Sequence, residues 1–217
     1  MSKTEKYGIG TIHENKHGEK FEIIGKCNDY NYRLIKFLDL YKYIGEAHLS
    51  SIRQMQVKNP YRKSVLGIGY HGEGIDFSKL RCDSRHPLYT TWLRLLDRCY
   101  NTKHNKYHLY GAKGVTVCEE WHSFSNFVYD ITGMYNGDLL YQSKIIENYK
   151  GIKYALDKDS TKSKIYSEDT IKIIPMKINS GLCNIKDEGR KSEIMQDILD
   201  NEKATNWVCG TNKGLFL

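Results

Sequence analysis

Long apolar runs and prolines are scarce in this chain of 217 residues. No apolar run approaches the ~20 residues that a membrane-spanning helix needs, and the first residues, MSKTEKYGIG, lack the apolar core of a signal peptide. Only three prolines and no long Gly/Ser tract argue against extended disorder. We therefore expect a soluble, cytoplasmic protein with one full-sized domain or two small ones, for which 40% apolar residues supply a core.

Closely spaced cysteine pairs are missing as well. None of the six cysteines lies within four residues of another, so the usual spacing of a zinc knuckle is absent. Reduced, partly buried thiols are the expectation in a cytosol, and a zinc site built from distant cysteines is the alternative. The positions are Cys27, Cys82, Cys99, Cys118, Cys183 and Cys209.

Acidic residues are absent from two stretches of a chain whose net charge is +7. Residues 47–72 and 98–118 contain Lys and Arg but no Asp or Glu, and the second stretch interleaves its lysines with tyrosines. Cations bind phosphates and tyrosines stack on bases, so this pattern favours a nucleic-acid partner, DNA above all, over a merely solvated surface. The side chains predicted to contact it are Arg53, Lys58, Arg62, Lys63, Arg94, Arg98, Lys103, Lys106 and Lys113.

The order of apolar patterns predicts an α+β protein in three parts. Residues 1–57 read as a small β-rich module, because short runs rich in Ile, Tyr, Phe and Leu are separated by turn-type residues. Residues 58–80 read as a basic, glycine-rich linker, and residues 81–217 as a domain with flanking helices. Helical spacing of apolar residues predicts helices over 88–100 and over 123–133.

The last third of the chain predicts a strand, a polar loop, a second strand and a helix. The strands are expected at 153–159 and 169–175, and the helix begins at 176. Residues 134–152 show no clear pattern, and a short amphipathic helix is expected at 192–202.

A metal site is the first chemical prediction from this segment. Asp157 and Asp159 follow each other at strand spacing, and Asn179 lies in the following helix. Carboxylate and amide oxygens suit Mg²⁺ or Mn²⁺ rather than zinc. The alternative is a hairpin whose aspartates face solvent and a helix that Asn179 caps.

At these residues the sequence resembles HNH-like proteins of phages and prophages, a family of the ββα-metal or His-Me finger type. The pieces that carry the resemblance span about residues 58 to 180. They are Trp92, Arg98-Cys99-Tyr100, Tyr110 to Gly114, Val117 to Trp121, Phe124 and Phe127, Leu156-Asp157-Lys158-Asp159, and Tyr166-Ser167.

The resemblance implies a divalent-metal-dependent endonuclease in the cytoplasm of a bacterial host cell. Hydrolysis of the phosphodiester would leave a 5′ phosphate. The metal ligands would be Asp157 or Asp159 together with Asn179, and the β-rich module and the linker would add affinity for DNA. A small β-rich N-terminal module followed by a ββα-metal (HNH-like) domain is the fold that this reading expects.

The sequence departs from the family pattern at three positions. Lys158 stands where a histidine serves as general base, Thr170 stands in place of the loop asparagine, and the helix ligand is Asn179 rather than histidine. A lysine is ordinarily protonated near neutral pH, which makes it a poor base but a good phosphate ligand. The catalytic candidates are therefore Asp157, Lys158 and His122. The general base is left open between His122, His108 and Tyr110.

Loss of the base leaves a second function open. A catalytically inactive HNH-like scaffold can act as a phage anti-defence inhibitor that binds a host protein or a protein–nucleic acid complex. The basic charge argues against mimicry of DNA by such an inhibitor, because mimicry needs an acidic surface. No recognition-helix signature supports a transcriptional regulator.

Overall fold

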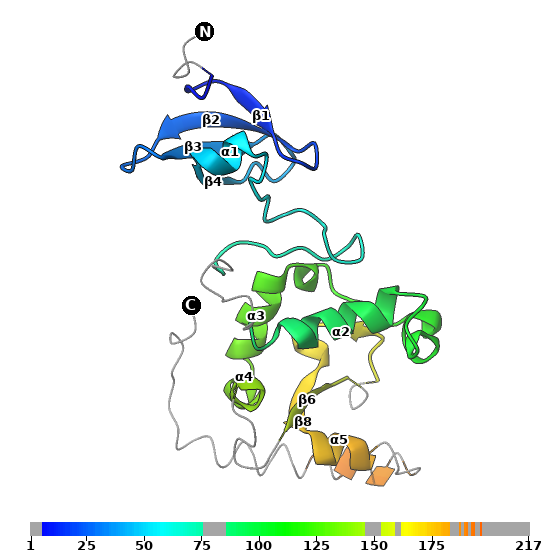
Figure 1. Ribbon diagram of the computed structural model, residues 1–217. Coiled ribbons are helices and arrows are strands. Elements are labelled where there is room, and N and C mark those ends of the chain that lie inside the picture. Colours follow the sequence, from blue (N-terminus) through cyan, green and yellow to red (C-terminus); the bar gives the residue numbers. More distant parts are fainter. Residues whose placement is uncertain are drawn as a thin grey trace. The chain divides into compact units, whose positions relative to one another are not determined.

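The computed structural model describes residues 6–75, 86–145, 153–158 and 162–182, and the single positions 187, 189, 190, 192, 193 and 196. Both helices and strands are present, as expected of an α+β protein. The chain divides into two compact units, Met1–Arg62 and Lys63–Leu217 (Figure 1). Residues 58–62 of the expected linker thus belong to the first unit. Most of the helix expected at 192–202 lies outside the described residues.

The first unit is a four-stranded antiparallel meander followed by a short helix. Its strands pair in chain order, and Phe21, Ile23, Ile35 and Phe37 point to one buried face because alternate strand residues share a face. Ile52 of the helix covers that face. The elements are β1 (Ile12–Glu14), β2 (Lys20–Lys26), β3 (Tyr32–Phe37), β4 (Ile44–His48) and α1 (Leu49–Arg53).

Two helices form the first half of the second unit, as the apolar spacing predicts. α2 (Tyr89–Tyr100) buries Trp92, Leu95, Leu96 and Cys99. α3 (Phe124–Gly133) begins at the predicted cap, where Oγ of Ser123 accepts a hydrogen bond from the backbone N–H of Asn126 at 3.4 Å. Within the described residues, no helix is long and apolar enough to cross a membrane.

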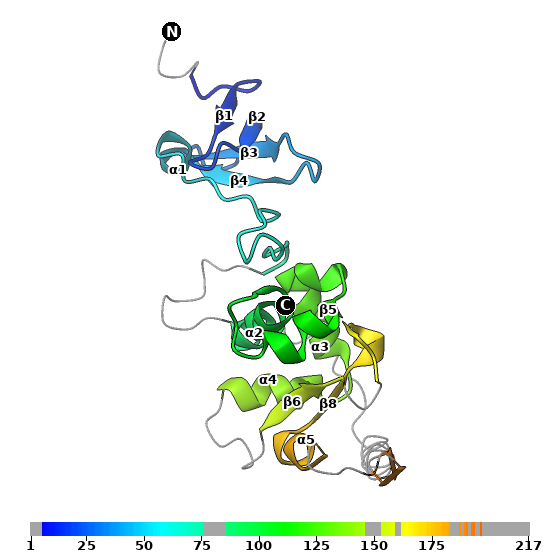
Figure 2. The ribbon, with the colours of Figure 1, turned by 90° about the vertical axis from the view of Figure 1, so that its right-hand side faces the viewer.

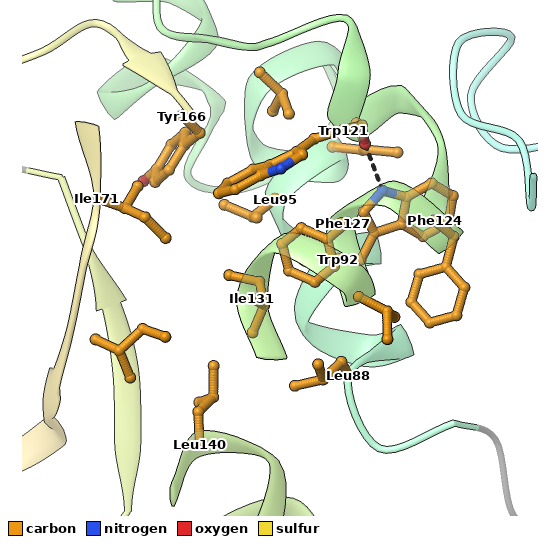
Figure 3. Packing of buried hydrophobic residues seen from close by; sticks show 14 of the residues in the cluster. Leu88, Trp92, Leu95, Trp121, Phe124, Phe127, Ile131, Leu140, Tyr166 and Ile171 are labelled. Carbon is orange, nitrogen blue, oxygen red and sulfur yellow. Dashed lines mark hydrogen bonds between the residues drawn. The ribbon is translucent and has the colours of Figure 1, made fainter. Parts of the chain in front are cut away.

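The core between these helices is aromatic (Figure 3). Trp92, Trp121, Phe124 and Phe127 are all fully buried. Nε1 of Trp92 donates to the backbone oxygen of Trp121 at 2.7 Å, and Nε1 of Trp121 donates to Oδ2 of Asp130 at 2.7 Å. Both indole N–H groups are therefore paired, so the two largest core side chains leave no buried donor unsatisfied.

One α-helix and one β-strand of the second unit were not predicted from the sequence. Helix α4 (Gly137–Ile145) falls in the stretch without a pattern, and strand β7 (Ile165–Tyr166) pairs in parallel with β5 (Thr116–Val117). Buried Asn136 precedes α4, and its side chain donates to the backbone oxygen of Ile173 at 3.1 Å. The helix is thus positioned by a tertiary contact rather than by a repeating apolar face.

The predicted strand–loop–strand–helix segment is present. β6 (Tyr154–Asp157) pairs antiparallel with β8 (Lys172–Pro175), and α5 (Met176–Leu182) follows β8 directly. Figures 1 and 2 both show β6 and β8 side by side, with α5 beyond one end of the pair. Asp157 pairs in register with Lys172, so this aspartate ends β6 opposite the start of β8.

Gly111 provides a test of packing near the end of α2. It begins the 3-10 helix η2 (Gly111–Lys113), where an added Cβ meets the backbone oxygen of Cys99 and the ring of Tyr107. We expect Gly111→Ala to lower the free energy of unfolding by about 1–3 kcal/mol, because a backbone atom cannot move aside easily. Urea unfolding measures the change. Gly133→Ala is the matched control, since nothing lies within 4 Å of its added Cβ. Equal stability of the two variants would contradict the prediction.

Candidate functional site

A pocket of about 500 Å³ opens in the second unit, between α2, α4, α5 and the end of β6. Side chains from widely separated positions meet there because β6 packs against both α4 and α5. Seven of the candidate site residues named from the sequence line this pocket: Arg94, Arg98, Lys106, Tyr110, Asp157, Lys158 and Asn179.

The two predicted metal ligands within the described residues share this pocket. Asp157 is 5% exposed at the end of β6, so the alternative in which it faces solvent is wrong. Asn179 lies inside α5 rather than at its N-terminus, so it is not an N-cap. Both side chains carry oxygen atoms of the kind that Mg²⁺ and Mn²⁺ bind, and both line the one pocket. Asp159 lies outside the described residues.

Two cations share the same pair of tyrosine rings. The guanidinium carbon of Arg98 lies 4.9 Å from the ring centroid of Tyr110 and 5.0 Å from that of Tyr166. Nζ of Lys158 lies 5.6 and 5.7 Å from the same two centroids. Cation–π contacts of this kind hold a charge in place without neutralising it. Nε of Arg98 is buried and has no hydrogen-bond partner.

A further pair of cations, from α2 and α4, lines the pocket. Arg94 is one helical turn before Arg98 on α2, and Lys144 reaches the pocket from α4. The Lys144 side chain is exposed, yet partial desolvation lowers its pKa, and the nearby charges of Arg94 and Lys153 lower it further. The sequence did not predict Lys144 because α4 carries no helical pattern.

The histidines differ in their relation to the pocket. His122 and the exposed His108 are not among its lining residues. Nε2 of His122 lies 3.2 Å from Oη of Tyr100, which also bonds both backbone groups of Val117. Burial lowers the pKa of His122. The structure therefore places this histidine beside β5, apart from Asp157.

His104 does line the pocket, although it was not among the candidates named from the sequence. Nδ1 of its ring accepts the backbone N–H of Lys106 at 3.1 Å, and Nε2 lies 3.5 Å from Oδ2 of Asp97. Both ring nitrogens are therefore engaged. The sequence feature that could have drawn attention to His104 is the acid-free stretch 98–118, in which this histidine lies.

Thr170 occupies the position of the expected loop asparagine, and it pins the loop between β6 and β8. Its Oγ1 donates to the backbone oxygen of Ile165 at 2.6 Å and accepts the backbone N–H of Ser167 at 3.0 Å. Both bonds tie the 3-10 turn η6 (Glu168–Thr170) to the residues just before it, which include strand β7. A hydroxyl thus fixes the loop where an amide was expected.

The remaining predicted phosphate ligands lie outside the pocket. In the first unit, Arg53 lies over the ring of Tyr7 at 5.5 Å, Nη1 of Arg62 lies 4.0 Å from Oε2 of Glu19, and Lys58 is exposed. In the second unit, three further lysines are exposed and do not line the pocket: Lys63, Lys103 and Lys113.

The thiols near the core are held in their protonated form. Burial raises the pKa of Cys99 to about 11 and that of Cys118 to about 11. A zinc ligand has to be the thiolate, so these two environments disfavour zinc. Within residues 6–75, 86–145 and the described part beyond, no three His, Cys, Asp or Glu side chains gather as a metal-binding group.

Comparison of the chain with protein-family models, with curated proteins and with solved structures found no match. The function is therefore inferred from the pocket and from the residues that line it.

Proposed function

We propose that this chain is a DNA-binding protein of HNH-like, ββα-metal type, and that it hydrolyses phosphodiester bonds with Mg²⁺ or Mn²⁺. One observation carries the proposal: Asp157 and Asn179, on the strand and helix of a strand–loop–strand–helix segment, line one pocket with Arg94, Arg98 and Lys158. Oxygen atoms suited to binding a metal ion and cations suited to binding a phosphate thus line the same pocket.

The chemistry divides between a metal and the chain's own side chains. Asp157 and Asn179 would hold the cation, which when bound neutralises the phosphate and stabilises the leaving oxygen. Arg98 and Lys158 bind the non-bridging phosphate oxygens, and the tyrosine rings beneath them fix their positions. Thr170 fixes the loop that leads from β6 to β8. These side chains orient the substrate before any bond breaks.

The second candidate is the inactive scaffold, a phage anti-defence inhibitor that binds a host protein or a protein–nucleic acid complex. Two observations favour it. Lys158 stands at the position of the general base, and both nitrogens of His104, the histidine that lines the pocket, are engaged. Of the base candidates His122, His108 and Tyr110, the pocket lining contains Tyr110, whose ring contacts Arg98 and Lys158. A binding protein needs no base.

A plasmid-nicking assay separates the two candidates. We expect purified protein to nick supercoiled plasmid at low salt with Mg²⁺ or Mn²⁺, and not with EDTA, because the metal supplies the charge stabilisation. A gel mobility shift in EDTA measures binding alone, which we expect to weaken steeply with salt because phosphate contacts release counterions. Binding without nicking in either metal would retire the endonuclease and leave the inactive scaffold. Loss of both readouts would retire the DNA partner as well.

A further inference from the structure

The cations of the pocket exceed what one phosphodiester needs. Five Lys or Arg side chains and one Asp line it among the described residues. One backbone phosphate carries a single negative charge, so an occupied pocket would keep several unbalanced cations at close range. The excess points to a ligand with more than one phosphate.

Four of these five cations fall into two groups, and Lys106 belongs to neither. The inner group is Arg98 and Lys158, which share the rings of Tyr110 and Tyr166. The outer group is Arg94 and Lys144, which comes from a different helix, α4. Arg94 and Arg98 lie four residues apart on α2, so their Cβ atoms are about 5–6 Å apart on one face.

The outer group also shows mutual repulsion. The pKa of the exposed Lys144 is lowered by partial desolvation and by the charges of Arg94 and Lys153, so these cations crowd one another. A bound anion removes that repulsion, which adds to the free energy of binding at this place. The outer group is thus built to receive a charge of its own.

We propose that the pocket binds two successive phosphates of one nucleic-acid strand, one at Arg98 and Lys158 and its neighbour at Arg94 and Lys144. This inference rests on the proposed function, because it assigns places within the same pocket. The inner phosphate lies in the subsite that includes Asp157, and the outer phosphate holds the strand in register. The outer subsite therefore positions the strand, and the phosphodiester bond is broken at the inner subsite.

The salt dependence of binding counts the phosphates. We would measure the affinity for a short DNA duplex in EDTA at several salt concentrations, with Arg98→Gln for the inner subsite and Arg94→Gln/Lys144→Gln for the outer. Each set is expected to lower the slope of log K against log salt by about 1, and all three substitutions together by about 2. Lys164→Gln, an exposed lysine away from the pocket lining, is the control and should affect the slope less than either set.

A second measurement guards against misfolding of the Arg98 variant. Calorimetric titration of the wild type should show a nucleoside 3′,5′-bisphosphate binding at least about tenfold tighter than the 5′-monophosphate, a preference that the Arg94→Gln/Lys144→Gln variant loses. If only Arg98→Gln changes the slope, or if the outer variant keeps the preference, the second subsite is overturned while the proposed function stands. If no pocket variant changes the slope, the proposed function fails with it.

Discussion

Replacing Asp157 by asparagine is expected to reduce metal-dependent nicking by at least about 10²–10³-fold, the loss usual for removing one preorganised charge-stabilising group. Asp157 is the one acid among the described residues that line the pocket. The substitution keeps the shape of the side chain and removes the charge that would hold the cation. DNA affinity in EDTA should stay level or rise, because an acid leaves a cationic pocket. Initial nicking rates and a mobility shift on the same preparation measure both effects.

Asp138→Asn is the matched control, since Asp138 is exposed on α4 and away from the pocket lining. It should leave both readouts unchanged.

Lys158→His adds a histidine where HNH enzymes carry their base, and we expect it to raise the nicking rate of a protein that holds its metal at Asp157. Nicking that survives Asp157→Asn at full rate would remove this aspartate from the chemistry.

Replacing Trp92 by alanine is expected to lower the free energy of unfolding of the second unit by about 3–5 kcal/mol. Trp92 is fully buried, and its ring centroid lies 5.2 Å from that of Phe124 and 5.6 Å from that of Tyr89. The truncation leaves a cavity in this aromatic core and an unpaired backbone oxygen at Trp121. Both effects act in the same direction, and together they are a large part of a typical domain's stability.

Urea unfolding followed by far-UV circular dichroism measures this change, and Trp92→Phe separates its two parts. Phenylalanine fills most of the space but cannot donate to Trp121, so its cost should be smaller, about 1–3 kcal/mol. Tyr129→Ala, at a side chain 69% exposed on α3, should stay within about 0.5 kcal/mol of the wild type. A Trp92→Ala cost no greater than that of Tyr129→Ala would contradict the packing described for this core.

The parts of the fold that sequence could predict are those whose residues repeat at a period. The buried face of α2, the cap of α3 at Ser123 and the strand that ends at Asp157 all follow from local spacing. Helix α4 and strand β7 do not, because the first is held by Asn136 and the second has only two residues. Short elements of this kind are set by tertiary contacts, which no local window contains.

The same division applies to the candidate site. Asp157, Asn179 and the two arginines of α2 could be singled out, because residue type and helix spacing point to them. Lys144 could not, since its helix was not predicted. His122 illustrates the reverse case: its position before a helix suggested a base, and the fold places it against Tyr100 and outside the pocket lining.

The parallel pairing of β5 with β7 has a consequence for synthesis on the ribosome. Val117 pairs with Tyr166, a fully enclosed member of the aromatic core that arrives late in the chain. Helices α2 and α3 are complete before it, so the nascent chain exposes part of their apolar faces until Tyr166 emerges. Chains emerge from their N-terminus, and such exposed surface attracts chaperones and neighbouring nascent chains. Truncation before Ile165 should therefore yield aggregates rather than a smaller folded protein.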